Sequence, residues 1–192
     1  GCVVFNVYEI HWGWPLAIGS SVLYAWLFAS ARVYGDAGLQ VFFAATAAWG
    51  WWQWLFGRRR IEGSAAPAQP LRVTTLDARA RVRVLVFWLA GWLSLGLMLS
   101  RFTDSDVPWL DAFPTAGSVI AQILLARKYV DTWWVWLGVN VGSVALFGYK
   151  DLWLTALLYL IFIGLSVQGL MRWRRQLEQQ SRMSSASAES IA

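Results

Sequence analysis

Long apolar segments separated by short polar breaks make up most of this chain. A segment of about 20 residues is the length of helix that crosses the hydrocarbon core of a bilayer. Gly1 to Glu9 is too short to span and is interpreted as the last part of an incomplete first helix. Pro15 lies in the opening turn of the second helix, where its missing N–H is harmless. The further helices are predicted over residues 16–33, 39–56, 82–99, 111–127, 131–149 and 151–173.

Three stretches lack this apolar character. Tyr34–Asp36 is predicted to end the second helix. Residues 57–81 are rich in Gly, Ser, Pro, Ala and Arg, so they are predicted to form a polar linker in which Thr75 or Asp77 caps the next helix. The residues after Arg174 are polar and Ser-rich, and a disordered tail is predicted there.

The composition is that of an all-α, polytopic membrane protein. Of 192 residues, 58% are hydrophobic and 14% charged, which is far less charge than a soluble domain exposes. Thirteen of the sixteen Lys and Arg residues fall on one side of the predicted helices, so that side and the C-terminus are interpreted as cytoplasmic. The net charge of +5 therefore indicates a lipid bilayer rather than nucleic acid as the partner. The one cysteine, Cys2, excludes an internal disulfide, and neither a metal nor a cofactor is expected.

Similar Trp and Gly spacings in the two halves indicate a parallel repeat, an architecture found in transporters. The matched residues are Trp12 with Trp134, Trp14 with Trp136, Gly50 with Gly169 and Trp54 with Trp173. The alternative is that Trp is enriched at membrane interfaces at matching depths. The predicted organisation is a first three-helix repeat (1–56), a cytoplasmic linker (57–81), a connecting helix (82–101), a second repeat (107–173) and a cytoplasmic tail (174–192).

The helix predicted after Asp131 carries the strongest candidate site. Trp133, Trp136 and Asn140 stand at i, i+3 and i+7, so they share one helix face near the middle of an uncharged span. A carboxamide at that depth needs a partner. Two indoles and an amide suit a flat aromatic ligand that itself carries an amide. The alternative is that the indoles belong to an interfacial belt and Asn140 bonds only a neighbouring helix.

The helix before the linker repeats this combination of aromatic rings and a carboxamide. Trp49, Trp52 and Gln53 are candidate binding residues on it, whereas Trp51 and Trp54 are predicted to be belt residues. The small residues Gly138 and Gly142 flank Asn140 in the later helix and are interpreted as a packing surface for another helix.

A polar stripe runs along the fifth predicted helix. Asp111, Thr115, Ser118 and Gln122 are spaced four, three and four residues apart, which keeps them on one face. Such a stripe would be costly against lipid, so it is predicted to face protein or a water-filled path; the alternative is hydrogen bonding between helices alone. Tyr159 on the last helix is a further candidate.

Other classes of function find little support in the residues. We find no paired carboxylates within a span, no metal cluster and no phosphate-binding loop, so an enzyme is not predicted. An intramembrane enzyme and a purely structural membrane subunit remain as competing hypotheses.

The same motifs resemble the PnuC family of bacterial vitamin transporters, above all its nicotinamide riboside members. The Trp-x-x-Trp-x-x-x-Asn pattern matches Trp133, Trp136 and Asn140, and an earlier Trp-x-x-Trp matches Trp49 and Trp52. The resemblance also includes the Asn6–Pro15 turn, Tyr34–Asp36 and the Lys128–Trp136 stretch. It covers nearly the whole chain except the linker and the tail.

The resemblance implies seven transmembrane helices in a 3+1+3 arrangement related to the SWEET transporters, with the first helix incomplete in this sequence. It implies a homotrimer in the bacterial inner membrane. It also implies facilitated diffusion of nicotinamide riboside, a precursor of NAD, which a cytoplasmic kinase then traps. Relatives carry thiamine, riboflavin or deoxynucleosides, and the visible motifs do not separate these substrates.

Overall fold

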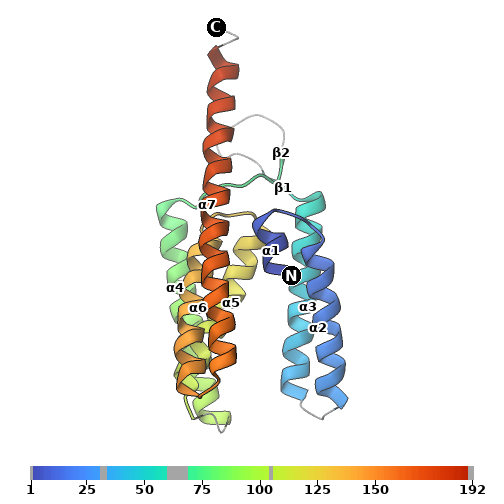
Figure 1. Cartoon of the computed structure of the whole chain (residues 1–192), viewed down its shortest axis with the longest axis vertical. Coiled ribbons are helices and arrows are strands. Elements are labelled where there is room, and N and C mark those ends of the chain that lie inside the picture. Colours follow the sequence, from blue (N-terminus) through green and yellow to red (C-terminus); the bar gives the residue numbers. More distant parts are fainter. Residues whose placement is uncertain (1, 31–33, 60–68, 104–105, 190–192) are drawn as a thin grey trace. The chain divides into compact units, whose positions relative to one another are not determined.

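The computed structural model describes residues 2–30, 34–59, 69–103 and 106–189 (Figure 1). Most of the residues in these ranges are helical, and short connections and one pair of short strands make up the rest. The helices are α1 (Cys2–Val7), α2 (Gly13–Ser30), α3 (Tyr34–Phe56), α4 (Ala78–Phe102), α5 (Pro108–Ala126), α6 (Thr132–Tyr149) and α7 (Trp153–Glu189). The strands β1 (Arg58–Arg59) and β2 (Gln69–Pro70) pair antiparallel.

Several helix ends differ from the predicted ones. The break predicted at Tyr34–Asp36 is wrong, because α3 already begins at Tyr34. The start predicted at residue 111 for the fifth helix is also wrong, because α5 begins three residues earlier, at Pro108, and Pro114 therefore lies inside it. Pro108 needs no helical N–H partner at this position. Of the two predicted caps of α4, Asp77 is confirmed, since its Oδ1 accepts the N–H of Ala80 at 2.7 Å.

The disordered tail predicted after Arg174 is wrong for most of its length. The helix α7 continues to Glu189 and extends well beyond the N-terminal end of α6 in Figure 1. Residues 174–189 contain neither Pro nor Gly, and most are Arg, Gln, Glu, Leu, Met or Ala, which favour helix, or Ser, which tolerates it. The predicted helix end at Val33, the middle of the linker (60–68) and the last three residues lie outside the described ranges.

Within the part of the chain that the structure describes, three helices, α4, α5 and α7, are long and apolar enough to cross a membrane. Large apolar side chains on several helices are exposed: Trp26 is 70% exposed, Phe87 67% and Leu154 83%. A soluble monomer does not expose so much apolar surface, whereas lipid tails solvate it. The prediction that α2, α3 and α6 also span stays a prediction.

The chain divides into two compact units, Gly1–Arg72 with Gln122–Lys128, and Val73–Ala121 with Tyr129–Ala192. In the first unit, α2 packs on α3 through Trp14, which is 1% exposed. Its indole covers Gly50, where a methyl group would collide with the ring. It also meets the ring of Trp54 edge-on, at 5.4 Å between centroids and 79° between planes.

In the second unit, α6 packs on α7 in the same way. Trp133, 1% exposed, covers Gly169, where a methyl group would lie 2.5 Å from Cε2 of the indole. Its ring meets that of Trp173 edge-on, at 5.5 Å and 87°. Glycine is needed at 169 because the ring of Trp133 occupies the space that a Cβ would fill.

These two sets of contacts are related by one shift of 119 residues along the chain, as from Trp14 to Trp133. The same shift relates the turns that precede the two helices. Glu9 and Lys128 both have φ 54°, in the left-handed region, and the N–H groups of Glu9 and Lys128 each donate to a carbonyl three residues back. Trp133, not Trp136, is therefore the counterpart of Trp14, which corrects the predicted pairing by three residues.

Aromatic rings separate α4 from the helices beside it in the second unit. The ring of Trp88 lies against Gly117 and Gly138, where methyl groups would come within 2.6 and 2.7 Å of it. Its Nε1 donates to the carbonyl of Phe113 at 3.1 Å. The ring of Phe113 lies against Gly142. Gly138 and Gly142 thus serve packing, as predicted, but they accommodate aromatic side chains rather than a closely approaching helix backbone.

Part of the predicted linker is packed on the second unit. Val73 is 2% exposed, and the N–H of Val130 donates to the carbonyl of Thr74 at 2.9 Å. The carboxylate of Asp131 accepts the N–H of Leu76 at 2.8 Å and Nε of Arg81 at 2.7 Å. Residues 73–77, which lie in the predicted polar linker, are therefore held by the turn before α6.

Candidate functional site

Asn140 and Ser166 form a polar pair inside the α6–α7 interface. Asn140 is 3% exposed and Ser166 2%. Nδ2 of Asn140 donates to Oγ of Ser166 at 3.1 Å, and that hydroxyl donates to the carbonyl of Phe162, four residues earlier, at 2.8 Å. The carboxamide therefore has a hydrogen-bond partner, as its burial requires. Its predicted contact with a ligand stays a prediction.

Aromatic contacts lie on both sides of this pair. Trp133 and Trp173 make one, seven residues before Asn140 and seven after Ser166. The rings of Phe147 and Tyr159 make the other, stacked at 5.3 Å with 14° between planes. The spacing of seven on both antiparallel helices is typical of helices that cross at about 20°. We call these contacts the two aromatic layers, and the Asn140–Ser166 pair the polar layer.

The candidates of the second unit differ in accessibility. The indole of Trp133 is enclosed by Gly169 and Trp173, so packing accounts for its burial. Trp136, on the same face, is only partly buried. Tyr159 has one ring face covered by Phe147. These observations favour Trp136 over Trp133 as an indole that a ligand reaches.

The polar stripe of α5 is engaged mostly with its own helix. The hydroxyl of Thr115 donates to the carbonyl of Asp111, and that of Ser118 to the carbonyl of Pro114, both at 2.8 Å. The Asp111 carboxylate binds the ammonium of Lys150 at 2.9 Å. Hydroxyls bonded in this way still have oxygen lone pairs that can accept a hydrogen bond, so the lining role predicted for the stripe, which also includes Gln122, stays a prediction.

The candidates of the first unit lie on α3. Trp49 and Gln53 are partly buried, and Trp52 is 56% exposed beside Phe56. Trp54, predicted to be a belt residue, has specific partners within the protein. Besides its contact with Trp14, its Nε1 donates to the carbonyl of Leu125 at 3.1 Å.

An ion pair beside Trp54 was not predicted. Nζ of Lys128 lies 2.9 Å from Oε2 of Glu9 and 4.8 Å from the centroid of a Trp54 ring. The two charged side chains are 15% and 17% exposed, so the pair is largely shielded from solvent. In the sequence, the pair is indicated only by a lone carboxylate, Glu9, at the end of an apolar stretch. The shift of 119 residues that relates Glu9 to Lys128 becomes clear only from the backbone conformation of the two turns.

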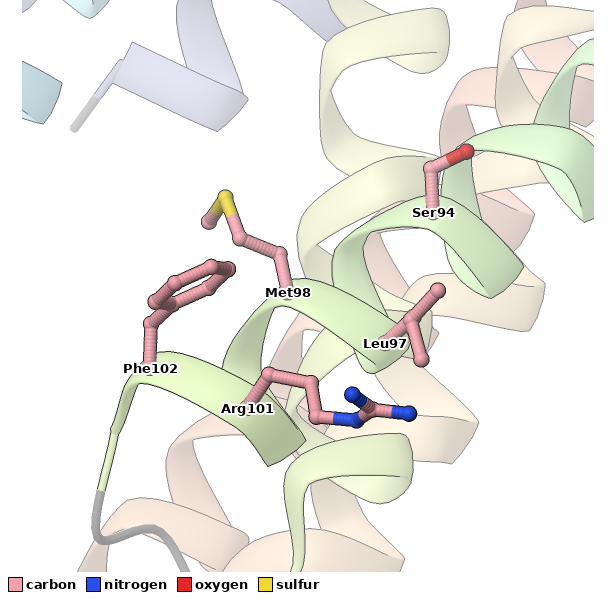
Figure 2. A pocket seen from close by; sticks show the side chains of 5 residues that line it. All are labelled: Ser94, Leu97, Met98, Arg101 and Phe102. Atoms are coloured by element: carbon pink, nitrogen blue, oxygen red, sulfur yellow. The ribbon is translucent and has the colours of Figure 1, made fainter.

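An open cavity of about 530 Å³ lies along the C-terminal part of α4 (Figure 2). It is lined by Ser94, Leu97, Met98, Arg101 and Phe102. None of these is a predicted site residue, so this cavity does not coincide with the polar layer. Among the described residues, no cluster of His, Cys, Asp and Glu could hold a metal ion.

Comparison with known proteins places these features in a family. A family model described as nicotinamide mononucleotide transporter matches residues 1–175. The chain is 26% identical over 172 residues to the riboflavin/roseoflavin transporter RibM of Streptomyces davaonensis, covering 89% of this chain and 78% of that protein. It is 24% identical to the nicotinamide riboside transporter PnuC of Escherichia coli K12, covering 79% and 71%.

The structural comparison agrees. A crystal structure of the vitamin B3 transporter PnuC matches with a TM-score of 0.68 at 21% identity, covering 93% of this chain and 77% of that one. At this identity the likeness shows a shared fold. The family match over residues 1–175, together with the all-helical fold and its apolar spans, establishes that the chain belongs to the PnuC family of membrane transporters.

Proposed function

We propose that the chain mediates facilitated diffusion of nicotinamide riboside across the bacterial inner membrane, with a cytoplasmic kinase trapping the product. Membership of the PnuC family supports the transport class. The observation that carries the site is the buried carboxamide of Asn140, held at 3.1 Å from Ser166 between two aromatic layers. An uncharged span with one oriented amide suits a ligand that carries its own amide.

The proposed site combines indole rings with neutral hydrogen-bonding groups. A cationic pyridinium ring over a Trp face gains about 0.5–2 kcal/mol, and more where water is excluded. The amides and hydroxyls would then bond the carboxamide and the ribose. The residues proposed to contact substrate are Trp49, Trp52, Gln53, Thr115, Ser118, Gln122, Trp133, Trp136, Asn140 and Tyr159.

We also propose seven transmembrane helices in a 3+1+3 arrangement, a homotrimer and a cytoplasmic C-terminus. The shift of 119 residues that relates Trp14, Gly50 and Trp54 to Trp133, Gly169 and Trp173 supports two equivalent three-helix units. In this proposal α4 is the odd helix that connects two three-helix repeats of parallel direction. The excess of Arg and Lys on one side supports the orientation.

Riboflavin is the second candidate substrate. The observation in its favour is that the riboflavin/roseoflavin transporter RibM is as similar to this chain as PnuC of E. coli, at 26% and 24% identity. Both vitamins contain a flat aromatic ring, a polyhydroxylated group (a ribose ring or a ribityl chain) and an N–H next to a carbonyl. A partly buried Trp136 and the Asn140 carboxamide could serve either.

Uptake by proteoliposomes that contain the purified chain tests the proposal. Labelled nicotinamide riboside should enter the vesicles without ATP or an ion gradient. Net uptake should stop when its concentration is equal on both sides of the membrane. Asn140→Ala should lower uptake about tenfold, because a hydrogen bond in a dry site is worth about 1.5 kcal/mol. Uptake of riboflavin but not of nicotinamide riboside would show that the proposed substrate is wrong, although the chain would still be a vitamin transporter. Uptake of neither vitamin would refute the proposed function.

A further inference from the structure

The hydroxyl of Ser166 has only one hydrogen, and it is directed to the carbonyl of Phe162 at 2.8 Å. Towards Asn140 this hydroxyl can therefore act only as an acceptor. The group of Asn140 that faces it must be the NH₂, which agrees with the 3.1 Å contact from Nδ2 to Oγ. The carbonyl oxygen Oδ1 of Asn140 then points away from Ser166. No described residue donates a hydrogen bond to Oδ1.

The first unit shows that packing does not require this polar pair. The shift of 119 residues relates Asn140 to Ser21 and Ser166 to Ala47. Ala47 is 2% exposed, so α3 presents a buried methyl group where α7 presents a hydroxyl. The Trp–Gly–Trp contact is nevertheless the same in both units. A buried polar pair that packing does not need indicates a role in recognition.

We propose that Ser166 is a positioning residue that fixes the carboxamide of Asn140 with Oδ1 presented as an acceptor to an N–H or O–H group of the substrate. This inference rests on the proposed function, in which Asn140 contacts the transported vitamin. Without the Ser166 hydroxyl, the amide is free to rotate by 180° and to present its NH₂ instead. Ser166 thereby selects ligands that carry a donor at this point of the ring.

A measurement without substrate tests the orientation directly. The chain contains two asparagines, Asn6 and Asn140, so selective ¹⁵N-asparagine labelling gives two side-chain amide signals in the NMR spectrum. Asn140→Ala assigns them. The Asn140 signal should be protected from exchange with water in the unmodified protein, and Ser166→Ala should shift it and speed that exchange at least tenfold. An Asn140 signal that Ser166→Ala leaves in place overturns the proposal.

Uptake kinetics test the consequence for recognition. Ser166→Ala should raise KM about 3- to 10-fold with little change in the maximal rate, since one bond to the substrate is weakened. This variant should fold, because Ala47 occupies the equivalent buried position. Ser166→Thr keeps a hydroxyl that can donate four residues back, and it should restore KM. Ser143→Ala is the matched control, because that buried hydroxyl bonds only the carbonyl of Val139, at 2.9 Å.

A double-mutant cycle separates positioning from a general effect on structure. In an Asn140→Ala background, Ser166→Ala should have no further effect on KM, because it acts through the missing amide. An equal, additive rise in KM in that background would contradict the proposal. Absence of uptake by the unmodified protein would refute the proposed function instead, while the NMR result would still decide whether Ser166 orients Asn140.

Discussion

Replacing Gly169 by alanine tests the packing on which both units depend. The added methyl group would lie 2.5 Å from Cε2 and 2.6 Å from Cδ2 and Cζ2 of Trp133. Normal contact needs about 1 Å more, and the indole is 1% exposed with Trp173 against it, so it has little room to move. Overpacking of this kind costs about 1–3 kcal/mol. Alanine also stabilises a helix by about 1 kcal/mol relative to glycine, which partly hides the steric cost.

Gly164→Ala is the matched control on the same helix. A methyl group there meets nothing within 4 Å, so this variant gains the helical preference without the clash. The difference between the two variants isolates the steric term. At about 2–4 °C per kcal/mol for a chain of this size, Gly169→Ala should melt about 2–12 °C below Gly164→Ala.

Thermal unfolding of the detergent-solubilised protein, followed by size-exclusion chromatography of the heated samples, measures this difference. Gly50→Ala should behave like Gly169→Ala, because its methyl group meets Trp14 in the same way. Equal melting temperatures for Gly169→Ala and Gly164→Ala would show that Trp133 yields easily, and the account of the shared Trp–Gly contact would then be wrong.

Two carboxylates that are largely shielded from solvent, Asp131 and Glu9, provide the remaining predictions. Asp131→Ala removes the acceptor of the Leu76 N–H and should destabilise the protein by about 1–3 kcal/mol. Arg81→Ala should destabilise it less, because the Arg81 side chain is 57% exposed. The melting temperatures of the two variants test this difference. Glu9→Gln leaves the shielded ammonium of Lys128 unpaired and should cost about 3–5 kcal/mol, while Glu9→Gln with Lys128→Met should recover much of the loss. A double variant as unstable as the single one would contradict the ion-pair account.

Features that depend on local sequence were predicted well. The bounds of α6 agree to within one residue, because an uncharged stretch lies between Asp131 and Lys150. The cap at Asp77 was one of two that the sequence allowed. The similar Gly and Trp spacings of the two halves were also recognised from the sequence. Spacing alone did not show that Trp14 corresponds to Trp133 rather than to Trp136, three residues later.

Features that depend on distant contacts were not predicted. Asp131 was expected only to begin a helix, but its partners Leu76 and Arg81 lie 55 and 50 residues away. Trp54 was placed among belt residues and Trp52 in the site, although Trp54 packs on Trp14 and Trp52 is exposed. Consecutive tryptophans on an apolar helix carry no polar face that would show which of them points inward.

The amino-acid sequence by itself determined the membrane class, most of the helices and the family, because these follow from hydropathy, charge and short motifs. The tertiary structure alone decided which tryptophan packs on which glycine, and that Asn140 bonds Ser166. The physical reason is that lipid and protein interior are both apolar, so the same side chains suit either face of a helix. Only the fit of one helix against another distinguishes the two faces.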